Sequence, residues 1–85
     1  MELAPAGTYA TDTGHHHLII DNELPDLGMP IPSDNNHLHF GKAQDRVLLD
    51  LEPGLHTLQL LLGDGSHIPH QPPLISEKIE IRIVP

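Results

Sequence analysis

The sequence has no cysteine among its 85 residues, so disulfides, thiolate metal ligands and cysteine nucleophiles are excluded. Aromatic residues are almost as scarce: Tyr9 and Phe40 are the only large rings, and the core must otherwise consist of leucine, isoleucine and valine. A chain of this length forms one domain, residues 1–85, and buries roughly 60–65% of the surface that its unfolded form exposes. Association into a homo-oligomer would add to this modest stability.

Basic residues are also few, with four lysines and arginines against twelve acidic residues and a formal net charge of −8 at pH 7. Phosphate backbones and anionic lipid surfaces repel such an acidic protein, so no nucleic acid is expected as a partner. The longest apolar runs, residues 60–62 among them, are far too short to cross a bilayer, and no membrane insertion is expected. Residues 1–5 lack the basic region and apolar core of a secretion signal.

Proline and glycine, by contrast, are abundant. Nine prolines and seven glycines interrupt the chain so often that no helical periodicity extends beyond a turn or two. The sequence therefore predicts an all-β fold, a small immunoglobulin-like antiparallel β-sandwich or partial barrel with long proline-rich loops. The predicted strands span residues 14–21, 37–40, 46–51, 55–62 and 77–84.

Turn residues and alternation predict how some of these strands pair. Residues 46–62 predict a hairpin, because two apolar runs flank a Pro-Gly turn. Residues 77–84 alternate isoleucine with charged residues, so one face of this strand is expected to be buried and the other solvated. The connections at 24–36 and 63–73 are long for so small a domain and are candidate functional loops.

Seven of the eight histidines lie in three short motifs, the first of which is GHHHLIID at residues 14–21. Strand alternation places His15 and His17 on one side, about 6.5–7 Å apart along the backbone, a span that two imidazoles can close around one ion. His16 shares the other side with Leu18 and Ile20, which is equally consistent with a buried histidine satisfied by hydrogen bonds.

The second motif, NHLHFG at residues 36–41, repeats the spacing and places His37 and His39 on one side. The third, GDGSHIPH at residues 63–70, adds His67 and His70 in a loop. The remaining histidine, His56, shares a strand face with leucines, which favours a core or supporting role over ligation.

These motifs define a candidate metal-ligand set, and no catalytic residue or organic cofactor is predicted. Imidazole ligands without thiolates suit a zinc, copper or nickel ion. The alternative is a hydrogen-bonded histidine network that locks loops to strands in place of aromatic packing. The candidate ligands are His15, His17, His37, His39, His67 and His70.

The chain resembles a bacterial histidine-rich family, domain of unknown function 4399. The resemblance is carried by GHHHLIID at residues 14–21, PIPSDNNHLHFGKAQ at 30–44, PGLHTLQLLLGDGSHIPHQPPLISEKI at 53–79 and the lead-in APAGT at 4–8. It implies a β-strand fold, and it transfers no established activity. Relatives are often exported, to the periplasm or the extracellular space, and typically have a further strand before the APAGT stretch. The resemblance therefore implies that a second subunit supplies an edge that this chain lacks.

Three functions follow from these observations. The leading hypothesis is a non-enzymatic domain that binds a late transition metal through its clustered histidines, and its metal affinity falls as the imidazoles protonate. The second is an oligomeric protein-interaction module in which histidines and residues 68–74 form the interface. The third is a metal-dependent hydrolase in which Glu23, Asp64 or Glu77 acts as the base toward a metal-bound water.

Overall fold

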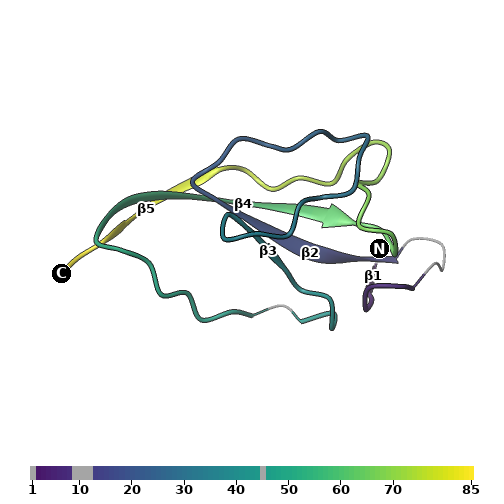
Figure 1. Cartoon of the computed structure of the whole chain (residues 1–85), viewed down its shortest axis with the longest axis horizontal. Helices are drawn as coiled ribbons and strands as arrows, with labels where there is room; N and C mark the ends of the chain where they lie inside the picture. The colour runs from purple at the N-terminus through teal and green to yellow at the C-terminus, as the bar shows by residue number, and fades with distance from the viewer. Residues whose placement is uncertain (1, 9–12, 45) are drawn as a thin grey trace.

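The structure, a computed structural model, describes residues 2–8, 13–44 and 46–85. The all-β prediction is confirmed: the described residues contain no helix, and their strands form one open sheet (Figure 1). Nothing in these ranges forms a helix long and apolar enough to cross a membrane. The strands are β1 (Glu2–Leu3), β2 (Thr13–Ile20), β3 (His37–His39), β4 (Gly54–Gly63) and β5 (Ile79–Ile83).

Strand β2 is the centre of the sheet. It pairs antiparallel with β4 along one edge, and its other edge carries β3 in antiparallel and the short β1 in parallel orientation. Strand β5 pairs antiparallel with the outer edge of β4 and so ends the sheet. Four of the predicted strands are confirmed with small shifts in their ends. Strand β1 was not predicted, because two residues carry no readable alternation.

The predicted hairpin at residues 46–62 is wrong. Residues 46–51 form no strand, and β4 pairs instead with β2 and β5. The Pro-Gly turn is a local preference, whereas β2 brings the buried Leu18, Ile19 and Ile20 against β4. Burial of large side chains outweighs a turn preference, because fully burying one such side chain contributes about 1.5–3 kcal/mol. Leu48, at the middle of the predicted strand, is 98% exposed.

The two faces of the sheet carry separate apolar clusters. On one face Ile19 and Leu61 pack against Ile31, from the connection at residues 21–36. On the other face Leu18 and Ile20 pack against Phe40 and the segment at residues 42–53. Figure 1 shows these irregular segments on opposite sides of the sheet. The expected immunoglobulin-like sandwich is therefore not confirmed, since loops rather than a second sheet cover both faces of the described sheet.

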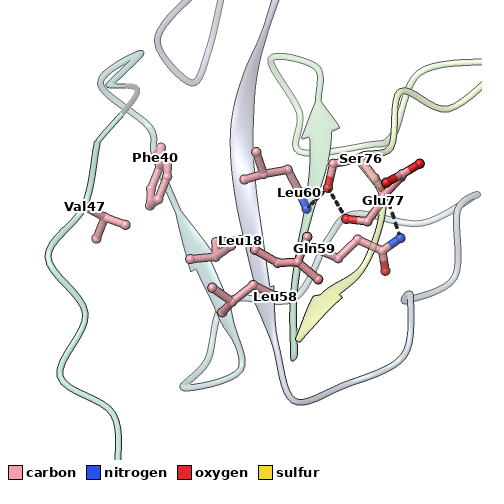
Figure 2. A pocket seen from close by; sticks show the side chains of 9 residues that line it. Leu18, Phe40, Val47, Leu58, Gln59, Leu60, Ser76 and Glu77 are labelled. Atoms are coloured by element: carbon pink, nitrogen blue, oxygen red, sulfur yellow. Dashed lines mark hydrogen bonds between the residues drawn. The ribbon is translucent and has the colours of Figure 1, made fainter. Parts of the chain in front are cut away.

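The Leu18 face is incompletely covered. A groove of about 500 Å³ opens between β2, β4 and the segment at residues 42–53. Figure 2 shows Val47 and Phe40 on one side of it and Leu58 and Leu60 on the other. At its far end the groove reaches Ile79 of β5, which is 52% exposed. The isoleucine face of β5 is thus only partly buried.

Candidate metal centre

Four histidines from three parts of the chain meet on the Ile19 face of the sheet. His15 and His17 point the same way from β2, as strand alternation requires. His39 is the register partner of His17 across the β2–β3 pair. His67 comes from the loop that follows β4. One ring nitrogen from each of the four can be chosen so that all lie within 4.8 Å of one another.

The four rings form a compact group rather than a chain of neighbours. Every pairing among them has a centroid distance between 4.5 Å, for His39 and His67, and 5.7 Å, for His17 and His67. A tetrahedral zinc ion with bonds of about 2.0–2.1 Å holds its nitrogen ligands about 3.3–3.4 Å apart. The widest separation in the cluster exceeds that spacing by roughly 1.4 Å, which side-chain rotation can close.

Burial sets this cluster apart from surface histidines. His15 is 0% exposed and His17 is 1% exposed, and neither ring nitrogen of either residue has a hydrogen-bond partner among the described residues. The cluster contains one internal hydrogen bond, between the Nε2 atoms of His39 and His67 at 2.8 Å. Buried polar groups in folded proteins nearly always have partners, because leaving one unpaired costs roughly 1–3 kcal/mol. Single unpaired nitrogens also occur in His16 and His70, but among the described residues only His15 and His17 have both ring nitrogens buried and unpaired.

Burial and neighbouring imidazoles favour the neutral form of three of the four rings. Burial, and then the neighbouring His39 and His67, lower the pKa of His15 to about 4. Burial, and then His15 and His39, lower the pKa of His17 to about 3. The pKa of His39 is lowered as well, first by burial and then by His67. A neutral imidazole offers the lone pair that a metal ion requires, so at neutral pH these three rings can bind a metal ion without losing a proton.

The loop after β4 is built to present His67. The Asp64 carboxylate accepts hydrogen bonds from the backbone N–H groups of Ser66 at 2.8 Å and Ile68 at 3.1 Å. The backbone N–H of His67 donates to the Asp64 carbonyl at 2.9 Å, and His67 itself has a φ of 66°. Such a left-handed conformation is uncommon outside glycine and is held only where surrounding contacts fix it. The His67 carbonyl accepts a hydrogen bond from Ile31 N–H, which ties this loop to the connection at residues 21–36.

Glycines give the imidazoles room. A Cβ atom on Gly63 would lie 2.8 Å from Cε1 of His17, and one on Gly41 would collide with the His39 ring. These glycines were not predicted as part of the site. Their positions could have identified them: Gly41 ends the second histidine motif in the sequence HFG, and Gly63 directly follows a predicted strand in the sequence LLG.

Two predicted ligands lie outside the cluster. The Nδ1–H of His37 donates to the Asp34 carboxylate at 2.7 Å, and this hydrogen bond is the main cause of the lowered pKa of Asp34. The Nε2–H of His70 donates to the Thr13 carbonyl at 2.9 Å. The structure thus brings together His15, His17, His39 and His67 and leaves His37 and His70 with protein partners.

The other two histidines also occupy the positions that alternation predicts. His16 faces the opposite side of the sheet, edge-on to Phe40 at a centroid distance of 6.4 Å. His56 donates through Nδ1 to the Asp21 carboxylate and through Nε2 to the Glu52 carbonyl, each at 2.6 Å. These bonds, with the Asp21 bond the larger cause, raise the pKa of His56. His56 therefore has a supporting role at the far end of the sheet.

Fold and site together define a small all-β domain with a four-histidine cluster at one end of its sheet, in which His15 and His17 are buried and His39 and His67 are half-buried. The chain belongs to the family described as Domain of unknown function (DUF4399), which matches residues 1–84. The resemblance expected from the histidine motifs is thereby confirmed. No curated protein and no solved structure matches the chain.

Proposed function

We propose that this domain is a non-enzymatic binding protein that holds one late transition metal ion. The proposed ligands are His15, His17, His39 and His67. One observation carries the proposal: two fully buried imidazoles have no protein partner among the described residues, and two further imidazoles bring nitrogens within 4.8 Å of theirs. A metal ion would bind one nitrogen of each of the four rings and would give His15 and His17 an interaction that they lack.

The hydrogen-bonded histidine network, the alternative to a metal-ligand set, accounts for the outer histidines better than for the cluster. His37, His56 and His70 each donate to a carboxylate or a carbonyl, as that hypothesis requires. Within the cluster only the His39–His67 bond follows this pattern. A structural network that left both nitrogens of His15 and of His17 unpaired would destabilise the fold, so the cluster supports metal binding.

The four ligands are all imidazoles, which restricts the class of metal ion that the site would bind. Neutral imidazoles suit zinc, copper and nickel, and the absence of cysteine excludes a site selected by thiolates. No carboxylate is among the grouped ligands. The charge of Asp64 partly offsets the lowering of the His15 pKa, and the same charge would favour a bound cation.

The geometry supports binding over hydrolysis. Catalytic zinc sites usually have three protein ligands and leave the fourth position to water or substrate, whereas structural sites fill all four positions with protein. Four histidines would fill them here. Two of the three candidate bases lie elsewhere: Glu23 pairs with Lys78 at 3.2 Å, and Glu77 lines the groove on the opposite face. The third, Asp64, accepts hydrogen bonds from two backbone N–H groups of its own loop.

Calorimetric titration of chelator-treated protein with zinc, copper and nickel at pH 7.5 tests the proposal. His39→Ala and His37→Ala form a matched pair, because the two residues lie in the same strand and differ in that only His39 belongs to the cluster. The expected result is near-stoichiometric binding by the wild type and by His37→Ala, and a loss of at least about 100-fold in affinity for His39→Ala. Equal affinities for the two variants, or no binding by the wild type, would exclude this site.

A further inference from the structure

The outer edge of β5 is unpaired within the described residues, and the backbone directions along it can be worked out from printed bonds. The N–H and C=O groups of Leu60 bond to Ser76, on the side of β4 that β5 occupies. The carbonyl of Thr57 points the other way, toward Asp21 at the end of β2. Backbone groups alternate in direction along a strand, so every second residue of β4, from Leu60 back to Gly54, faces β5.

This alternation fixes which groups of β5 point outward. Ile79, Ile81 and Ile83 are the register partners of the β4 residues that face β5, so their N–H and C=O groups are used within the sheet. The N–H and C=O groups of Glu80 and Arg82 therefore point away from β4. An edge strand with such free groups is a template for pairing with another strand.

We propose that this edge pairs with β5 of a second copy of the chain, antiparallel about a two-fold axis at Ile81. In that register Glu80 lies opposite Arg82 of the second copy, and the reverse pair forms on the other side of the axis. Ile79 lies opposite Ile83 of the second copy, so isoleucine meets isoleucine on the other face. The outward backbone groups of Glu80 and Arg82 meet in the two hydrogen-bonded pairs next to the axis, as antiparallel geometry requires.

The sequence of the strand favours a second copy over another partner. IEIRI is self-complementary only in this antiparallel register, because a glutamate and an arginine stand symmetrically about the central isoleucine. Each copy carries a net charge of −8, which opposes association. Charges farther apart than about 8 Å are largely screened at physiological salt, whereas the contacting Glu80–Arg82 pairs are closer than this and are screened less. The half-exposed isoleucine face would also continue from one copy into the next.

Charge exchange tests the register. Glu80→Lys places lysine opposite arginine in the homodimer, and Arg82→Glu places glutamate opposite glutamate. Both side chains are exposed, so both variants should fold. Sedimentation equilibrium should show a dimer for the wild type and a dissociation constant raised roughly tenfold or more for either variant, since two cross-strand pairs become repulsive at once.

Mixing the two single variants distinguishes this register from any other interface. In the mixture lysine at 80 meets glutamate at 82, and arginine at 82 meets glutamate at 80, so a heterodimer of near wild-type affinity should form. The Glu80→Lys/Arg82→Glu double variant should regain the homodimer. A monomeric wild type would overturn the proposal, and so would single variants whose affinity is unchanged or a mixture that fails to recover the dimer.

A backbone variant completes the test. Arg82→Pro removes an N–H that points outward, which an edge strand tolerates, and should give a folded monomer. Far-ultraviolet circular dichroism and metal titration, run on the same samples, should match the wild type, because the four-histidine cluster lies at the other end of the sheet. A dimer that survives Arg82→Pro would contradict pairing through this edge.

Discussion

Replacing a proposed metal ligand by an apolar residue should make the metal-free protein more stable. His17 is 1% exposed, and its two ring nitrogens have no partner among the described residues. Leucine has a similar volume and no polar atoms. An unpaired buried polar group costs roughly 1–3 kcal/mol, and a volume-conserving core exchange usually costs less than about 1.5 kcal/mol. His17→Leu should therefore raise the stability of the metal-free protein by about 1 kcal/mol.

The same substitution should reverse its effect when metal is added. For a domain of 60–100 residues, 1 kcal/mol corresponds to a shift in Tm of about 4–8 °C. A ligand at 1,000 times its Kd stabilises the folded state by about 4 kcal/mol, and only the wild type would gain this stabilisation. Thermal denaturation followed by circular dichroism should rank His17→Leu above the wild type in chelator and below it in excess zinc.

His37→Leu is the control for this reversal. His37 is also buried, but its Nδ1–H donates to Asp34, so its loss removes a hydrogen bond and leaves that carboxylate with the backbone N–H of Asn36. This variant should be less stable than the wild type both in chelator and in zinc. If His17→Leu behaves like His37→Leu, with a lower Tm under both conditions, the cluster is a structural network and the reasoning is refuted.

Three further predictions concern pH and packing. Because burial lowers the pKa values of His15 and His17 from 6.5 to about 4 and about 3, the unfolded chain takes up their protons first. Stability of the metal-free protein should therefore be highest above pH 6.5 and fall by a few kcal/mol as the pH drops toward 4 in denaturant titrations; a flat profile would argue against burial of the pair. The pKa of His56 is raised, so its contribution has the opposite sign: His56→Gln should cost most below pH 6.5 and least at alkaline pH, measured as the difference in Tm from wild type. Gly63→Ala should weaken zinc binding at least about tenfold, because its Cβ would lie 2.8 Å from the His17 ring, while Gly28→Ala, whose nearest contact is 3.5 Å, should leave the calorimetric Kd unchanged.

Alternation along strands was the part of the sequence that predicted structure best. It placed His15 and His17 on one side of β2 and His16 on the other, and the structure confirms this arrangement. It also identified the strand that became β5, where Ile79, Ile81 and Ile83 alternate with charged residues. These predictions hold because side chains in any extended strand point alternately to opposite faces, whatever lies around it.

Contacts between distant segments could not be predicted in the same way. The hairpin at residues 46–62 failed because strand pairing depends on which surfaces are buried, and a turn signal reports only local preference. Which of the six candidate ligands lie together could not be predicted either, for a similar reason. His37 and His39 look equivalent in the sequence, because they form one H-x-H pair. The carboxylate of Asp34, three residues before His37, nevertheless accepts a hydrogen bond from the His37 ring. His67 reaches the cluster with its backbone in a left-handed conformation, and nothing in the sequence predicted that conformation.

The most direct test of the central claim is a long-range ¹H–¹⁵N NMR spectrum of the histidine rings, recorded on chelator-treated protein before and after one equivalent of zinc. Ring nitrogens that bind zinc change their chemical shift, and each histidine is observed separately. The account predicts coordinated resonances for His15, His17, His39 and His67 and unchanged resonances for His37 and His56. Coordination by a different set of histidines, or no change in any ring, would contradict it.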